Sequence, residues 1–180
     1  MPALVDHLGF FFAYVFVDAF ALPIASTVYV AYMGERHAPL LVATLGAVAT
    51  TAGSIGQYLV VRWLVSHPAL QWRWLVRLRE GIVRAVQGTG NATFWALFVI
   101  YATPLGAGPL RLVAAVAGYS LPRFAAAIAL GCLPFYFLVA SLGRALRLPA
   151  WAYALLVVGT VVVTLVLFLR RRGRGGREAL

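Results

Sequence analysis

Two charged side chains, Asp18 and Arg111, lie inside apolar stretches of this chain, where an ionisable group is costly and usually functional. At bilayer depth such a group costs roughly 2.5–3.5 kcal/mol on insertion scales, so it needs a partner or water. We expect these two side chains to meet as a carboxylate–guanidinium pair near the midplane of the membrane and to form the functional centre. The alternative is that Asp18 caps a half-helix or faces an aqueous mouth.

Each charge lies in an apolar segment that proline interrupts. Residues 8–34 contain Asp18 and Pro23, and residues 93–118 contain Pro104 and Arg111. Proline removes an amide donor and disrupts the preceding turn, and lipid cannot satisfy the freed backbone groups. We therefore predict a re-entrant helical hairpin over each segment, with the break covered by other helices or lining a wet cavity. Two Pro-kinked spanning helices are the alternative.

Three apolar runs have the roughly 20 residues that a helix needs to cross a bilayer core. They are residues 40–61, 124–143 and 150–169. Of the 180 residues, 63% are hydrophobic and 11% charged, far from the roughly 25% charged of soluble domains. The composition therefore predicts an all-α integral membrane protein with one polytopic domain, 1–180, and a transmembrane helix over each run.

The arginines between and after these runs predict the orientation of the chain. Residues 67–92 place Arg73, Arg77 and Arg84 on one helical face, which favours an amphipathic helix lying in the membrane interface; a helix packed on the protein's own surface is the alternative. This connector holds four Arg against one Glu, and the basic tail, 170–180, holds five Arg against one Glu. By the positive-inside rule both are predicted to be cytoplasmic.

The two halves of the chain repeat one pattern. Pro23 precedes Arg62 by 39 positions, and Pro104 precedes Arg144 by 40. A broken hairpin followed by a spanning helix, twice and in opposite orientation, is the inverted-repeat plan of secondary transporters; chance similarity between apolar segments is the alternative. Both arginines end their helices, where they either extend toward lipid phosphates or act as ligands for a headgroup.

Three short motifs, in this order, resemble the DedA-like, VTT-domain family, also called SNARE-associated Golgi proteins, over roughly residues 14–144. Asp18 before the turn at 22–27 resembles the family's first-half motif, with Thr27 where Glu is usual. The stretch 53–62 is similar to its Gly-Asp-x-x-x-Tyr-x-x-Gly-Arg motif, with Ser54 in place of Asp. The stretch 101–111 resembles its Arg-Phe-x-Pro segment, with Tyr101 in place of the first Arg.

This resemblance implies two opposed re-entrant hairpins and movement of a lipid or lipid-linked phosphate between leaflets. The replaced positions remove charged groups that a proton-coupled mechanism would use, and they leave the architecture untouched. The residues expected to form the transport site are Asp18, Pro23, Ser26, Arg62, Tyr101, Pro104 and Arg111.

Two other functions stay open: a proton- or ion-coupled exporter of a small solute, and a membrane scaffold or assembly subunit that transports nothing. An enzyme is not expected, because the stretch 53–56 sets Ser54 between glycines without a histidine at membrane depth to act as its base. We expect no metal, cofactor or nucleic acid. The expected partners are membrane lipids, with a homo-oligomer left open, and the expected location is a bacterial inner membrane with the C-terminus in the cytoplasm.

Overall fold

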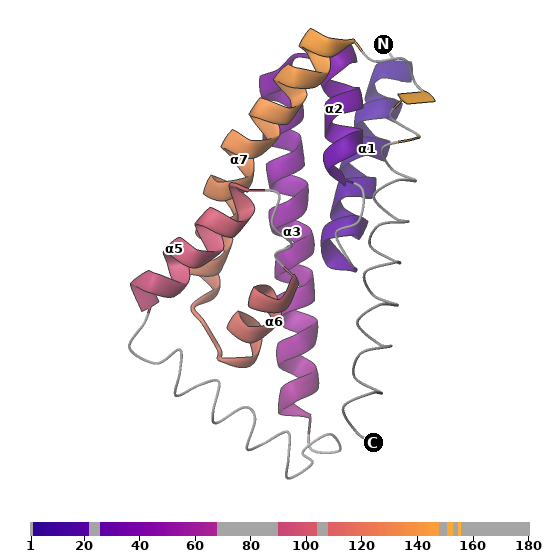
Figure 1. Cartoon of the computed structure of the whole chain (residues 1–180). Coiled ribbons are helices and arrows are strands. Elements are labelled where there is room, and N and C mark those ends of the chain that lie inside the picture. Colours follow the sequence, from indigo (N-terminus) through magenta and orange to yellow (C-terminus); the bar gives the residue numbers. More distant parts are fainter. Residues whose placement is uncertain are drawn as a thin grey trace, which may run out of the picture.

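The computed structural model describes residues 2–21, 26–67, 90–103, 108–147, 151–152 and 155. This part of the chain is helical and contains no strand, as predicted. The helices are α1 (Pro2–Phe20), α2 (Ser26–Arg36), α3 (Pro39–Ser66), α5 (Gly90–Tyr101), α6 (Gly108–Val116) and α7 (Leu121–Leu146) (Figure 1). Several predicted features lie outside the described residues: Pro23, Pro104, the basic tail, and most of both the connector at 67–92 and the span at 150–169.

Two long helices form the centre of the molecule. Helix α3 has 28 residues and α7 has 26, and each carries a proline in its first turn, where a missing amide donor costs nothing. In the described part of the chain, these two are the helices long and apolar enough to cross a membrane. They contain the predicted spans 40–61 and 124–143 and extend beyond both at each end.

Helix α1 packs along the first half of α3 and ends beside its middle. A side chain added at Gly46 would meet the Phe11 ring, and one added at Gly53 would meet the backbone of Phe16 and the Ala19 methyl group. Both helices therefore run in the same direction. Helix α2 then folds back along α1, and the Tyr29 ring lies 5.6 Å from that of Phe11.

The second half of the chain repeats this arrangement. Helix α5 packs on α7 and ends beside its middle, where Gly131 lies against the carbonyl of Phe98 and the Cβ of Tyr101. Helix α6 packs on α3, just as α2 packs on α7. The two short-helix pairs point toward opposite ends of the molecule (Figure 1). The described helices of the two halves therefore pack in a similar way but point in opposite directions, and the inverted repeat of re-entrant hairpins stays a prediction.

The contact between α2 and α7 is a close helix crossing. A Cβ added at Gly34 would overlap the backbone of Ala140, and one added at Gly143 would overlap the backbone of Ala31. Small residues on both helices allow this approach, as is common at helix contacts within membranes. The crossing joins the first hairpin to α7.

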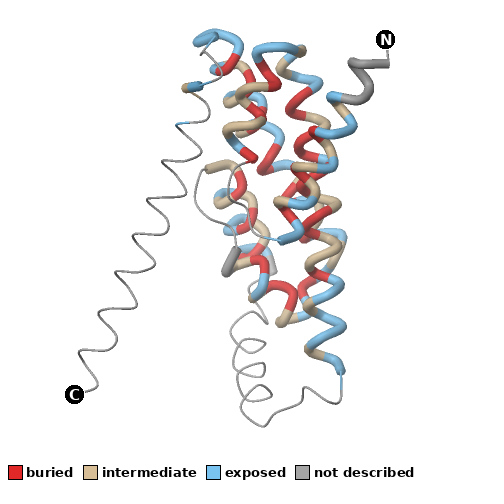
Figure 2. The backbone as a smooth tube through the Cα atoms, turned by 90° about the vertical axis from the view of Figure 1, so that its right-hand side faces the viewer, coloured by how far each residue is buried: buried red, intermediate tan, exposed pale blue. Residues whose placement is uncertain are grey.

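The outer faces of the helices are apolar. Buried residues lie along the contacts between helices, and exposed ones lie on the outside (Figure 2). Large apolar side chains are exposed on each long helix and on α1 and α5, for example Phe10, Val48, Trp63, Trp95 and Leu138. Soluble monomers rarely expose so much contiguous apolar surface, whereas lipid covers it well.

Candidate functional site

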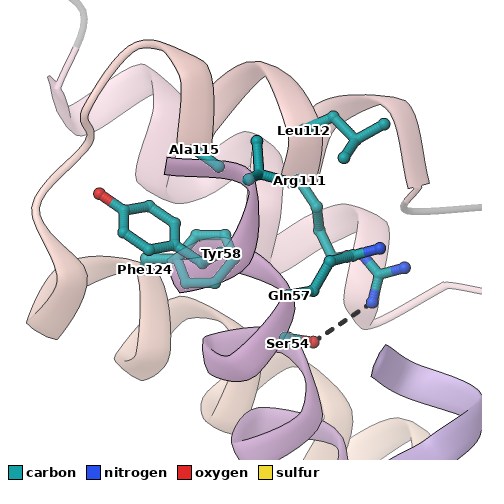
Figure 3. Close-up of a pocket in the computed structure, with 8 residues that line it drawn as sticks. Ser54, Gln57, Tyr58, Arg111, Leu112, Ala115 and Phe124 are labelled. Carbon is teal, nitrogen blue, oxygen red and sulfur yellow. Dashed lines mark hydrogen bonds between the residues drawn. The ribbon is translucent and has the colours of Figure 1, made fainter. Parts of the chain in front are cut away.

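Arg111, near the start of α6, is buried where the two halves of the molecule meet. Its side chain is 3% exposed, and among the described residues it is the one buried charged group. Nη1 donates a hydrogen bond to the carbonyl oxygen of Ala19, at 2.6 Å. Nη1 also donates to Oγ of Ser54, at 3.3 Å (Figure 3). One guanidinium therefore links α6 to both α1 and α3.

The end of α1 gives this guanidinium a favourable electrostatic environment. The carbonyl of Ala19 belongs to the last turn of α1, where backbone carbonyls lack partners within the helix. These carbonyls form the negative end of the helix dipole, which favours a nearby cation. Within the described part of the chain, the buried Nε of Arg111 has no hydrogen-bond acceptor. The guanidinium is therefore held in place, but its Nε–H remains free to donate a hydrogen bond to an anion.

Two hydroxyl groups complete the surroundings of Arg111. Oγ of Ser54 lies 3.3 Å from the hydroxyl of Tyr101, and either group can donate this hydrogen bond. Tyr101 is the last residue of α5, so helices α1, α3, α5 and α6 converge on one polar cluster. Ser54 is fully buried and Tyr101 almost so.

A second polar cluster lies one turn earlier on α3, nearer the start of the helix. The hydroxyls of Thr50 and Tyr136 are 2.9 Å apart, and Tyr136 also hydrogen-bonds the side chain of Ser26, the first residue of α2. Asp18 is half-buried and interacts electrostatically with the hydroxyl groups of Tyr14 and Tyr136. This cluster joins the first hairpin to both long helices.

Replacing Thr50 with valine is expected to destabilise the protein. The substitution keeps the side-chain shape but leaves the buried Tyr136 hydroxyl without one partner, at a cost of about 1–3 kcal/mol. The midpoint of thermal unfolding in detergent should fall by several degrees, at about 2–4 °C per kcal/mol for a chain of this size.

Thr51→Val is the matched control, because among the described residues the Thr51 hydroxyl bonds only a carbonyl of its own helix, that of Ala47. An equal fall in both variants would mean that the Thr50 hydrogen bond to Tyr136 adds nothing to stability.

The structure places the predicted site residues in three groups. Arg111 and Tyr101 share the polar cluster at Ser54, and Ser26 is buried in the second cluster close to Asp18. Arg62 is exposed near the end of α3, and its Nη1 donates to the hydroxyl of Tyr58 at 3.4 Å. The prolines lie outside the described residues. Arg111 contacts the backbone of the residue after Asp18, and the direct Asp18–Arg111 pair stays a prediction.

The sequence interpretation overlooked the polar side of α3. Four of its side chains make the hydrogen bonds described here and are spaced four residues apart: Thr50, Ser54, Tyr58 and Arg62. This spacing puts them on one face of a helix, and it is visible in the sequence. In the described part of the chain, no group of three or more His, Cys, Asp or Glu residues could hold a metal ion.

Comparison with known proteins gives one match. The family described as the VTT domain matches residues 8–145, which include all six helices described here except the ends of α1 and α7. No curated protein and no solved structure matches the chain.

Proposed function

Since the chain belongs to the VTT-domain family and is a membrane protein of the DedA type, we propose that it moves a phospholipid or a lipid-linked phosphate between the leaflets of the bilayer. The movement would be that of a scramblase, with the headgroup passing through the protein and the acyl chains remaining in lipid. The observation that carries this proposal is the buried Arg111 at the junction of the two hairpins.

The length of α3 indicates the depth of that junction in a membrane. At about 1.5 Å per residue, its 28 residues extend about 42 Å, more than the roughly 30 Å of a hydrocarbon core. If α3 is centred, Ser54 lies near the midplane, and Arg62 lies about 14 Å from it, at the edge of the core. Arg111, which bonds Ser54, then also lies near the midplane.

The same frame supports re-entrant hairpins. Helices α2, α5 and α6 have 11, 12 and 9 residues, too few for the roughly 20 that a spanning helix needs. Because α1 and α5 end beside the middles of α3 and α7, each hairpin would enter from one face, turn near the midplane and return. The excess of arginine in the connector at 67–92 supports a cytoplasmic position for the end of α3, and the membrane that we propose is a bacterial inner membrane.

The chemistry of Arg111 suits a phosphate group. A guanidinium presents several N–H donors in a fixed fork and binds phosphate oxygens with strong, charge-assisted hydrogen bonds. Nη1 is anchored by Ala19 and Ser54, which orients the fork and leaves Nε for the ligand. A cation near the midplane lowers the cost of bringing a lipid phosphate across the hydrocarbon core, because it replaces part of the water that the phosphate loses.

The test is movement of a headgroup-labelled phospholipid in vesicles that contain the purified protein. Vesicles with the protein should equilibrate the label between leaflets, and protein-free vesicles should not. Flux of a soluble compound that depends on a pH gradient would instead indicate an exporter. Inactivity in both assays would indicate a scaffold and would end the transport proposal.

Within the same assay, Asp18→Asn should abolish lipid movement while the protein still inserts. The change removes the one acidic charge in the first hairpin that lies at this depth, beside Tyr14 and Tyr136. Glu35→Gln is the matched control, because Glu35 is exposed near the end of α2. Full activity of Asp18→Asn would remove Asp18 from the site.

A further inference from the structure

A narrow pocket leads from Arg111 along α3 toward Arg62. In this structure the pocket is closed, because its lining side chains leave no room for a water molecule. Polar atoms line it at Ser54, Gln57, Tyr58 and Arg111, and apolar side chains of α6 and α7 cover it. Figure 3 shows the Tyr58 hydroxyl at the far end of the pocket from the Arg111 guanidinium. The pocket therefore extends the Arg111 site toward the end of α3.

Tyr58 closes the far end of this pocket. Its ring is 2% exposed and packs against that of Phe124, with the ring centres 5.0 Å apart. Its hydroxyl donates a short hydrogen bond to the carbonyl of Tyr119, in the turn between α6 and α7. This bond ties α3 to the base of the second hairpin, beside the pocket.

Arg62 holds the same hydroxyl from outside. Arg62 is exposed, yet its Nη1 points back to the Tyr58 oxygen, at 3.4 Å. A donor–acceptor distance this long marks a weak hydrogen bond. A phosphate oxygen is a stronger hydrogen-bond acceptor for a guanidinium than a phenol oxygen is. A phosphate that reaches Arg62 would therefore displace the Tyr58 hydroxyl as its acceptor.

Building on the proposed function, we propose that Arg62 and Tyr58 form an outer phosphate site for a lipid headgroup and that Tyr58 is the gate between this site and Arg111. A phosphate bound to Arg62 would accept the hydrogen bond that Nη1 now donates to the Tyr58 hydroxyl. The freed hydroxyl can turn to the phosphate and leave the Tyr119 carbonyl, which opens the pocket. Ser54 and Arg62 are eight residues apart on α3, so the headgroup then moves about 12 Å to reach Arg111.

The surroundings of Arg62 indicate a lipid rather than a soluble phosphate. Leu59 and Trp63 are 51% and 62% exposed beside it on α3. In the frame proposed above, Arg62 lies at the edge of the hydrocarbon core, so these side chains would contact acyl chains while the guanidinium binds the headgroup. Tryptophan is enriched at this depth in membrane proteins.

Binding can be tested on the purified full-length protein in detergent, without measuring transport. A short-chain, water-soluble phosphatidylglycerol should raise the midpoint of thermal unfolding of the wild type, because a ligand that binds only the folded state stabilises it. Arg62→Gln should lose at least half of this shift. Arg36→Gln is the matched control, since Arg36 is an exposed arginine in the last turn of α2, and it should keep the shift.

Each other outcome of this titration overturns the outer lipid site. No shift in the wild type, an unchanged shift in Arg62→Gln, or an equal loss in both variants would do so. An equal shift with inorganic phosphate alone would show that the site does not select a lipid. Because this measurement detects binding, it can succeed even where lipid movement in vesicles fails, and the two proposals can be judged separately.

The gate has its own readout. In a Cys132→Ala background, a cysteine placed by Ser54→Cys reports access to the pocket through its rate of labelling by a water-soluble maleimide. Adding Tyr58→Phe keeps the ring against Phe124 but removes the bond to Tyr119, and it should raise that rate at least fivefold. An unchanged rate would show that the Tyr58 hydroxyl does not close the pocket.

Discussion

Replacing Arg111 with glutamine should lower lipid movement in vesicles more than tenfold. Hydrogen bonds to charged groups contribute about 1.5–3 kcal/mol each, so losing the guanidinium at a phosphate site costs at least one factor of ten. The variant should still fold, because the substitution removes the desolvation cost of a buried charge along with its hydrogen bonds to Ala19 and Ser54.

Two comparisons make this result specific. Arg111→Lys keeps the charge but not the fork of N–H donors, so we expect partial activity. Arg123→Gln removes an exposed arginine at the start of α7 and should leave activity unchanged. Lipid movement at the wild-type rate in Arg111→Gln, with the protein eluting as one species from a sizing column, would refute the role given to this residue.

Replacing Gly143 with valine should prevent stable folding. The added side chain would overlap the backbone of Ala31, so no rotamer change in a neighbour can relieve the contact, and α2 and α7 must separate. Overpacking of this kind costs typically 1–3 kcal/mol and occasionally more, and here the loss of the crossing adds to it. We expect most of the protein to aggregate when extracted into detergent.

The control is the same change at a glycine with free space. Within the described part of the chain, a side chain added at Gly9 in α1 would meet nothing within 4 Å, so Gly9→Val should remain monodisperse with an unfolding midpoint close to the wild type. Gly143→Ala should fall between the two. If Gly143→Val behaved like Gly9→Val, the α2–α7 crossing would not be as close as described.

The helices and their breaks were predictable because they depend on local properties of the sequence. Apolar runs bounded by arginine and proline marked α3 and α7, and the interrupted segments 8–34 and 93–118 became pairs of short helices. The hydropathy pattern ended the predicted helix at residue 61, before Arg62, whereas α3 continues to Ser66. The C-terminal end of this long helix was therefore predicted too early. An arginine at the edge of an apolar run does not end a helix.

The contacts of the site could be predicted only in part. The sequence placed Arg111 against the first hairpin, since both lie in broken segments, and the structure has its guanidinium on the last turn of α1. It did not predict that Ser54 and Tyr101 would bond each other, because two neutral hydroxyls leave no charge signal to connect them. The inward direction of the Arg62 side chain depends on Tyr58 and Tyr119, which meet only in the folded chain.

The α2–α7 crossing also sets the order in which the protein can be made. Gly34 packs against Ala140, more than a hundred positions later in the chain, so the partner of α2 does not exist when α2 leaves the ribosome. During synthesis the first hairpin would therefore remain in the bilayer with one side unpacked until α7 is inserted. Insertion of α7 is then the step that completes the packing of α2.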